Sequence, residues 1–460
     1  MQRGEIEGRV EPFYYIPEIV ELEKKVRNIS TQRLKNFIIS ISSGATPSVR
    51  EEEKFYSSEE NGIPFIRVQN LSYTNELILD DLKYINQETH QNYLNRSQIR
   101  EGYLLVKITG VGRMAISSVV PKDFEGNINQ HLVAIKTKDC FTSEVLATFL
   151  NTDIGEKLAS RRATGGTRPA LDYTALKSIP IVFKPEIVEI VKKAVLAKRA
   201  KEAEAKALLA GIDEYLLNAL GIRLPEPTEK KKFFYMRANQ ISGGRFDPDY
   251  FDVTFSRLRG AIHSGNYPIE TLSKICEFIS NGKTPAKNEY SDEVTPYPII
   301  KVASYSGDTI DLDKVDYANN PRTCFVKEGD IFVLAAAHQP NYVGRFVKQL
   351  NENPTINTSF VGELICLRAQ QLSVKSGYLF ALLSTKIIKT LLNCEKRGQT
   401  SHIYPGDIRK ILIPLPPLAV QTEIAEYIRM IRAQAKQLEQ EAKEIIERAK
   451  QEVEAMILGS

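Results

Sequence analysis

The feature of this sequence that most constrains its fold is an internal repeat, because two copies of one unit are expected to fold alike. Residues 8–15 read GRVEPFYY, and residues 244–251 read GRFDPDYF. Five further pairs of segments follow in the same order, at offsets between 227 and 238 residues. They are SSGATP (42–47) with SNGKTP (280–285), IPFIRV (63–68) with YPIIKV (297–302), EGYLLV (101–106) with EGDIFV (328–333), VGRM (111–114) with VGRF (343–346), and GGT (165–167) with GQT (398–400).

Each copy is predicted to begin with a mixed α/β globule. Short runs rich in β-branched and aromatic residues predict strands, and clusters of Gly, Asn, Asp and Ser between them predict turns. The apolar spacing of 146–160 and 378–393 predicts an amphipathic helix in each copy. The expected strands are 65–69, 103–108 and 131–137 in the first copy, and 298–302, 330–334 and 362–368 in the second.

Each copy is predicted to end in one long helix. The first runs from about Glu186 to Leu220, between Pro185 and Gly221, which favour a helix start and stop. The second runs from about Thr422 to Leu458. At 1.5 Å per residue each helix is roughly 50 Å long. The predicted organisation is a first globular domain (1–184), a first helix (185–221), a second globular domain (222–420) and a second helix (421–460).

Apolar residues in both long helices recur every seven positions, which is typical of a coiled coil. In the first helix one such line is interrupted by Lys198, and a second line (Val188, Val195, Leu209 and Leu216) by Glu202. We therefore predict that the two helices pair. The residues expected in the seam are Val191, Ala205 and Ile212 in the first helix, and Ile424, Ile428, Ile431, Leu438 and Ile445 in the second.

Composition and short motifs exclude several classes of protein. The longest apolar run is the seven residues 331–337, whereas a membrane span needs about 20. The polar start of the chain predicts a cytoplasmic location. The five cysteines form no CxxC pair, so neither a disulfide framework nor a metal site is expected. A net charge of +4 permits nucleic-acid binding without requiring it.

The sequence segments that resemble catalytic motifs are all incomplete. The GKT of residues 282–284 lacks the first glycine of a phosphate-binding loop, because position 277 is Glu. The DPDY of residues 247–250 resembles the DPPY of amino-methyltransferases but lacks the second proline, and no G-x-S-x-G elbow is present. A non-catalytic binding protein is therefore expected.

Taken together, the repeated segments resemble the specificity subunit of type I restriction-modification enzymes. The resemblance rests on S-G-x-T-P near the first domain start (43–47) and its form N-G-x-T-P, with Asn for Ser, near the second (281–285). It rests also on the G-[DY]-[IL]-[LF]-V strand followed by V-G-R, on INQHLV (128–133) with INTSF (356–360), and on IPLPPLAVQ (413–421) before the second long helix. It implies an α+β fold with two target-recognition domains, whose long helices form an antiparallel coiled coil with pseudo-two-fold symmetry. Val420 stands where the family usually has Glu, and the first copy has a different helix start.

The resemblance also implies a function and partners. The chain would read a bipartite, asymmetric double-stranded DNA target, with one half-site for each domain and the helices setting the spacing. Two methylation subunits carrying S-adenosylmethionine would join it, as would restriction subunits that use ATP and magnesium. This chain itself would hold no cofactor. The alternative is a scaffold whose duplicated domains bind proteins and whose helices mediate assembly.

Candidate DNA-binding residues follow from the polar loops of each copy. Lys and Arg suit guanine or phosphate, whereas Gln and Asn suit adenine. Arg113 and Arg345 recur in both copies, which favours a shared phosphate-binding or structural role. The candidates are Thr46, Ser48, Arg50, Lys107, Thr109, Arg113, Thr167 and Arg168 in the first copy, and Lys283, Thr284, His338, Gln339, Asn341, Arg345, Gln399, Thr400, Ser401 and His402 in the second.

Overall fold

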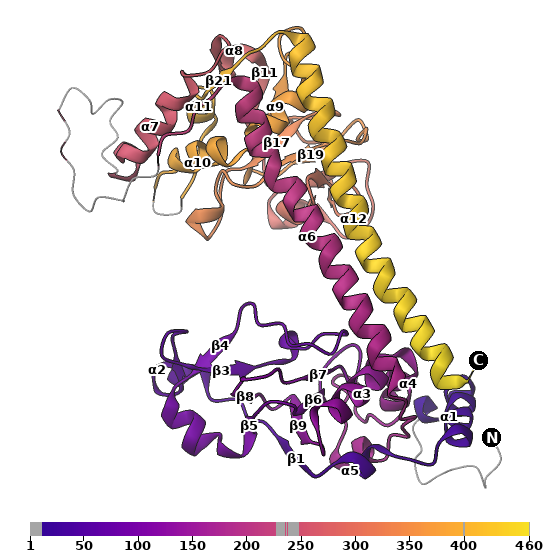
Figure 1. Cartoon of the computed structure of the whole chain (residues 1–460). Helices are drawn as coiled ribbons and strands as arrows, with labels where there is room; N and C mark the ends of the chain where they lie inside the picture. Colours follow the sequence, from indigo (N-terminus) through magenta and orange to yellow (C-terminus); the bar gives the residue numbers. More distant parts are fainter. Residues whose placement is uncertain (1–11, 227–234, 236, 238–247, 399–400, 460) are drawn as a thin grey trace. The chain divides into compact units, whose positions relative to one another are not determined.

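The structure, a computed structural model, describes residues 12–226, 235, 237, 248–398 and 401–459. The chain forms two compact units, which are best followed by colour in Figure 1. Unit 1 comprises residues 1–203 and 438–460, and unit 2 comprises residues 204–437. Both boundaries between the units fall inside long helices, so each long helix contributes to both units.

Unit 1 contains two sheets. The first is antiparallel, with the strand order β1-β9-β6-β7. The second has the order β2-β4-β3-β8-β5, and its β3 and β8 are parallel. The strands are β1 (Ser40–Ser43), β2 (Tyr56–Ser57), β3 (Ile63–Ile66), β4 (Lys83–Ile85), β5 (Gln98–Ile99), β6 (Leu104–Lys107), β7 (Ser117–Val119), β8 (Gly126–Ile128) and β9 (Leu132–Lys136).

Unit 2 repeats this strand order, which confirms the predicted duplication. Its strands β11-β20-β17-β18 correspond to β1-β9-β6-β7, and β12-β16-β13-β19 correspond to β2-β4-β3-β8. The parallel pair recurs as well, between β13 and β19. Unit 2 adds β14 and β15 to its first sheet and has a separate β10–β21 pair. The strands are β10 (Ile269–Thr271), β11 (Cys276–Asn281), β12 (Tyr290–Ser291), β13 (Pro298–Ile300), β14 (Tyr305–Ser306), β15 (Thr309–Ile310), β16 (Asp316–Ala318), β17 (Ile331–Leu334), β18 (Val347–Gln349), β19 (Ser359–Phe360), β20 (Leu364–Ala369) and β21 (Leu412–Pro414).

The central strand of each first sheet is buried on both faces. In β6, Leu104 and Val106 join the cluster that includes helices, whereas Leu105 faces Ile66 and Ile128 of the second sheet. In unit 2, Ile331 and Val333 alternate with Phe332 and Leu334 in the same way. This alternation follows from the two-residue period of a strand.

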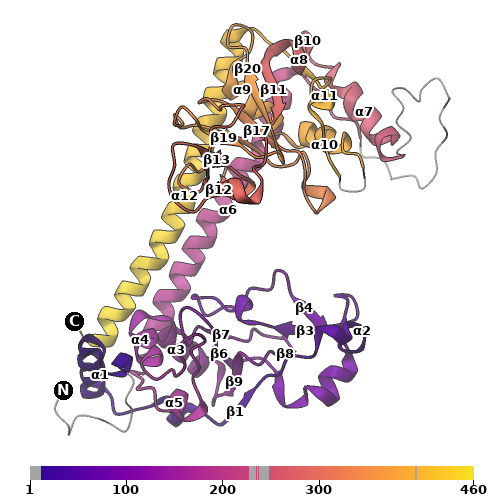
Figure 2. The same cartoon turned by 180° about the vertical axis from the view of Figure 1, so that it is seen from behind.

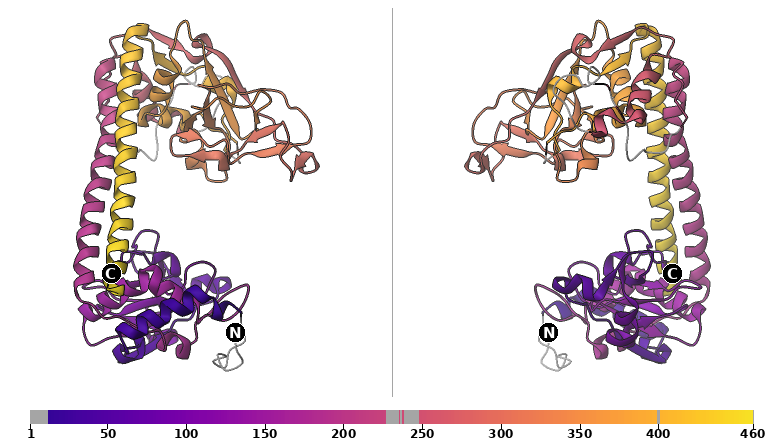
Figure 3. Two further views of the ribbon diagram at one scale, coloured as in Figure 1. Left: turned by 90° about the vertical axis from the view of Figure 1, so that its right-hand side faces the viewer. Right: turned by 90° about the vertical axis from the view of Figure 1, so that its left-hand side faces the viewer.

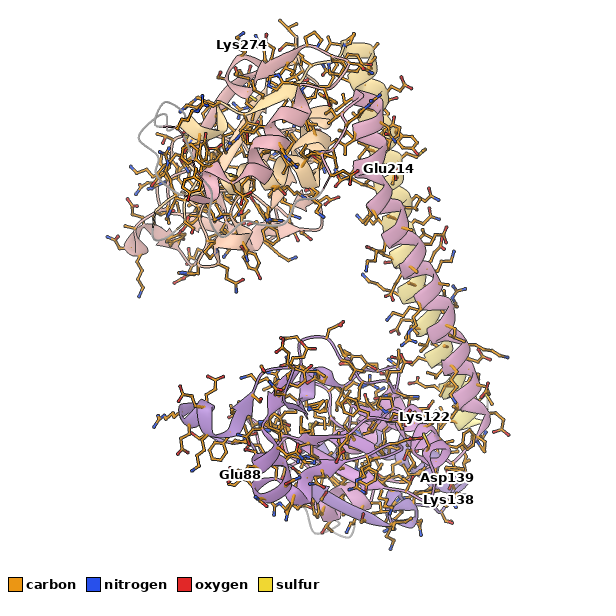
Figure 4. The ribbon with its side chains drawn as sticks, turned by 60° about the vertical axis from the view of Figure 1, so that its left-hand side comes forward. Glu88, Lys122, Lys138, Asp139, Glu214 and Lys274 are labelled. Atoms are coloured by element: carbon orange, nitrogen blue, oxygen red, sulfur yellow. The ribbon has the colours of Figure 1, made fainter. Side chains whose placement is uncertain are left out.

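The single helices predicted over 146–160 and 378–393 are wrong in one respect, because each is interrupted. Thr152 and Thr385 are in extended conformation, and each hydroxyl caps a new helix by accepting from the amide of Gly155 or Ile388. Asp139, labelled in Figure 4, caps the helix before the first break. The shorter helices are α1 (Pro17–Ile29), α2 (Glu52–Phe55), α3 (Cys140–Asn151), α4 (Asp153–Ser160), α5 (Tyr173–Lys177), α7 (Val253–Ile262), α8 (Leu272–Ile275), α9 (Ser376–Leu383), α10 (Lys386–Cys394) and α11 (Pro405–Ile408).

Two long helices, α6 (Glu186–Leu220) and α12 (Leu418–Leu458), are present as predicted. The second begins four residues before the expected Thr422, directly after Pro417. Gly221 and Gly459 follow the helix ends with φ of 69° and 72°, a left-handed conformation that glycine adopts without strain. None of the described helices has the length and apolarity that crossing a bilayer requires.

The helices α6 and α12 pair in antiparallel orientation within each unit, as Figures 2 and 3 show. In unit 1, Lys201 of α6 forms a 2.8 Å ion pair with Glu441 of α12. In unit 2, the rings of Tyr215 and Tyr427 lie 4.1 Å apart. Of the expected seam residues, Val191 and Ile445 are half-buried, and the others are buried: Ala205, Ile212, Ile424, Ile428, Ile431 and Leu438.

The second apolar line predicted for the first helix is not buried throughout, because Leu209 is 39 % exposed. The half-buried or buried positions that complete the heptads are instead Ala194, Lys198, Lys201, Leu208 and Tyr215. Lys198 interrupts the line of Val191, Ala205 and Ile212. Lys201 interrupts the line of Ala194, Leu208 and Tyr215, so a search for apolar residues every seven positions does not detect that line.

Candidate nucleic-acid interface

Three loops of unit 1 meet where β6 ends. The amide of Ile108 donates to the carbonyl of His131 (2.9 Å), directly before β9. The amide of Leu171 donates to the carbonyl of Ile108 (2.8 Å), and the amide of Gly110 donates to that of Pro169 (3.1 Å). Main-chain hydrogen bonds therefore hold residues 107–113, 129–131 and 164–171 together.

The SGATP loop joins this cluster because Gly44 has no side chain. A Cβ atom at Gly44 would collide with the carbonyl oxygens of Ile128 and Asn129. The Gly44 amide donates to the carbonyl of Leu132 (3.2 Å). This close approach puts the following loop, with the exposed Thr46, Ser48 and Arg50, beside residues 129–131.

Unit 2 builds the same arrangement with other residues. The amide of Ala335 donates to the carbonyl of Glu363 (2.8 Å), and the amide of Ile403 donates to that of Ala335 (2.9 Å). A Cβ at Gly282 would collide with the carbonyl oxygens of Phe360 and Val361. The predicted candidate loops are thus brought together in each unit.

Lys107 lies inside the unit 1 cluster and is not available on its surface. The residue is 4 % exposed, and its Nζ donates to the carbonyls of Val111 (2.8 Å) and Arg113 (2.9 Å). Burial lowers the pKa of this ammonium group. Lys107 therefore closes the loop that follows β6. Of the other candidates in these loops, Thr109 is half-buried, and Thr167 and Arg168 are exposed.

Arg113 and Arg345, which the sequence suggests share a role, differ in their surroundings. Arg113 pairs with Asp153 (2.7 Å) and donates to the carbonyls of Asn151 and Thr152. It therefore ties the loop to the start of α4. Arg345 is exposed, and the two arginines are not equivalent.

The loop after β17 is longer than its counterpart by five residues, His338–Tyr342, inserted before the shared V-G-R. His338, Gln339 and Asn341 on this insertion are all exposed. The side chain of Asn393 supports the insertion. Its Nδ2 donates to the carbonyl of Pro340 (3.0 Å) within the insertion and to that of Val343 (2.7 Å) directly after it. Unit 2 thus presents a supported polar loop that unit 1 lacks.

The last candidate segment lies beside this insertion. His402 bridges to Ala336 in antiparallel fashion, and its ring lies 6.3 Å from that of Tyr404. His402 is half-buried and Ser401 is buried, whereas Lys283 and Thr284 of the glycine loop are exposed. Gln399 and Thr400 lie outside the described residues.

Sequence reasoning missed two residues at the centre of the clusters, His131 and Glu363. Burial, followed by the charges of Arg168 and Lys107, lowers the pKa of His131. Glu363 Oε2 accepts a hydrogen bond from the Thr284 hydroxyl (2.9 Å). The signal that could have found them is their position directly before β9 and β20. His131 also lies in INQHLV (128–133), one of the segments that carried the resemblance.

Within the described ranges, no three His, Cys, Asp or Glu side chains lie close enough together to hold a metal ion. All five cysteines are free thiols.

Comparison with known proteins finds a family model that matches part of the chain. Residues 266–448 match the model of the type I restriction modification DNA specificity domain. No curated protein matches this sequence. Among solved structures, a chain from a study of complex assembly and conformational transition of the type I R-M system is 18% identical with a TM-score of 0.49, and the match covers 93% of this chain and 96% of that one. The HsdS subunit from Thermoanaerobacter tengcongensis is 18% identical (TM-score 0.37; coverage 93% and 95%), and the type I S subunit from M. genitalium is 11% identical (TM-score 0.40; coverage 93% and 95%).

Proposed function

We propose that this chain is a DNA-specificity subunit of a type I restriction-modification system, and that it reads a bipartite and asymmetric DNA target with one half-site for each unit. The match of residues 266–448 to the DNA specificity domain supports this proposal. The observation that carries the proposal is the repeated loop cluster. Both units bring the same loops together by the same main-chain contacts, yet they present different side chains. Two units with the same main-chain arrangement but different polar side chains suit two half-sites of different sequence.

The proposed assembly divides recognition from chemistry. This chain would supply sequence recognition and no catalytic group. Two methylation subunits would carry S-adenosylmethionine, and restriction subunits would use ATP and magnesium. Because its proposed target is cellular DNA, the proposed place of action is the cytoplasm.

The paired helices would set the gap between the half-sites. Lys201 pairs with Glu441 and Tyr215 packs on Tyr427, so opposing residue numbers keep a constant sum along the pair. Deleting 200–206 together with 436–442 therefore removes opposing heptads and preserves both seams. Seven residues correspond to about 10 Å of helix, so we expect the gap to shorten by about three base pairs.

Selection of bound sequences from a random duplex pool measures this gap. Both half-sites should persist in the double deletion. A variant lacking only 200–206 is the control, because its helices lose register and its bipartite selection should fail. A gap that keeps its length in the double deletion would refute the role of the helices as a spacer.

A further inference from the structure

His131 and Glu363 occupy the same place in the two units. Each stands directly before the second strand of its first sheet, β9 or β20. The carbonyl of each accepts the amide of the residue that follows the central strand, Ile108 or Ala335. In both units the glycine loop passes alongside. The side chain at this position therefore emerges where the candidate loops meet, and it is a histidine in one unit and a glutamate in the other.

The carboxylate of Glu363 is oriented by its neighbours. The Thr284 hydroxyl donates to Glu363 Oε2 (2.9 Å), and the amide of Gly362 donates to the oxygen of that hydroxyl (2.9 Å). These two bonds hold one carboxylate oxygen and leave Oε1 for a ligand. In the part of the chain that the structure describes, Glu363 forms no ion pair, and its side chain is half-buried.

A carboxylate on a DNA-binding surface has a narrow use. Phosphates repel it, so it weakens binding unless a base offers it a hydrogen-bond donor. In the major groove the pairing that suits Glu is the N4 amino group of cytosine. At the equivalent position, burial and then the charges of Arg168 and Lys107 lower the pKa of His131, which favours the neutral imidazole. A neutral imidazole presents one donor and one acceptor to a base edge.

We propose that Glu363 determines the base at one position of the second half-site by accepting a hydrogen bond from cytosine N4, and that His131 occupies the equivalent reading position for the first half-site. This inference rests on the proposed function. It assigns specificity to one residue of each unit that is not among the candidate DNA-binding residues predicted from the sequence.

The test is the substitution Glu363→Gln, which keeps the size of the side chain and an oxygen acceptor for Thr284. The full chain, co-purified with its methylation subunits, selects sequences from a random duplex pool. We expect one position of the second half-site to lose its cytosine preference, by about 5- to 100-fold, the cost of one mismatched base pair. Glutamine suits adenine, so the preference should move toward it. The first half-site and the gap should stay as in the parent chain.

Two further variants sharpen the test. Glu328→Gln makes the same change of charge at an exposed residue before β17, at the opposite end of that strand from the loop cluster, and should leave the selected sequence unchanged. His131→Glu should alter one position of the first half-site and none of the second.

Three results would count against this account. An unchanged sequence selected by Glu363→Gln would overturn the assignment, and so would equal weakening toward all sequences, because that indicates a structural role. A parent complex that enriches no two-part sequence would instead refute the proposed function itself. The parent selection distinguishes these failures.

Discussion

Replacing Glu23 with alanine is expected to destabilise unit 1 by about 3–5 kcal/mol, the usual cost of removing one partner from a buried ion pair. Glu23 lies on α1 and is 2 % exposed. Its carboxylate binds Arg162 (2.6 Å), Arg27 (2.5 Å) and Arg161. Alanine would leave Arg161 and Arg162, which are themselves buried, without this anion.

Urea unfolding followed by circular dichroism measures this loss. Hydrogen exchange would locate it, because protection should fall in α1 and α4. The matched control is Glu21→Ala on the same helix, since Glu21 is exposed and pairs only with Lys24 among the described residues. That change should leave the urea midpoint almost unchanged, because an exposed ion pair contributes little to stability. Equal urea midpoints for the two variants would contradict the structural role of Glu23.

The same residue gives a pH dependence. Burial on its own would raise the pKa of Glu23, but hydrogen bonds and charges from Arg162 and Arg161 outweigh it and lower the pKa from 4.5 to about 2. The stabilisation is therefore fully present above pH 5 and is lost as the pH falls toward 2. About 3 kcal/mol is linked to this protonation. The difference in urea midpoint between the parent chain and Glu23→Ala should shrink over that range, and a constant difference would show that the ionised form contributes nothing.

Removing the insertion His338–Tyr342 is expected to lower strongly the discrimination between bases in the second half-site. Unit 1 shows how the shortened loop can close, because Gly110 (φ 123°) directly precedes its V-G-R. The deletion is therefore combined with Ala337→Gly. Gly112 and Gly344, in the shared V-G-R, both have positive φ (81° and 73°), so the two frames match there.

Sequence selection compares the deletion with the parent chain. Loss of the exposed Gln339 and Asn341, which suit adenine, should lower discrimination in the second half-site by roughly 30-fold or more, the cost of two mismatched base pairs. The first half-site is the internal control, because unit 1 is untouched. Undiminished discrimination in the second half-site would show that this insertion does not read bases.

The repeat and the secondary structure could be predicted largely because they depend on local patterns. Short apolar runs rich in β-branched and aromatic residues mark β6 and β17, and the flanking Pro185 and Gly221 mark α6. The breaks at Thr152 and Thr385 could not be predicted in this way, since the apolar spacing continues across them. A threonine hydroxyl that caps a new helix decides the outcome there.

The site could be predicted only in outline, because side-chain partners come from distant parts of the chain. The sequence predicts that Lys107 is exposed. In the structure the loop after β6 folds back, and Lys107 Nζ donates to the carbonyls of Val111 and Arg113. The ion pair of Glu23 with Arg162 spans 139 residues. Its counterpart in the second copy, Arg259 with Glu395, spans 136 residues and has the charges exchanged. No spacing rule connects such partners.

The central claim is that the two units read two different half-sites of one DNA target. Its most direct test is to co-express the parent chain with its methylation subunits, capture the complex and sequence what it retains from a random duplex pool at low salt, where phosphate contacts are strongest. We expect an enriched two-part sequence with a fixed gap and unlike halves. A folded complex that enriches no sequence would contradict the claim and favour a protein-binding scaffold.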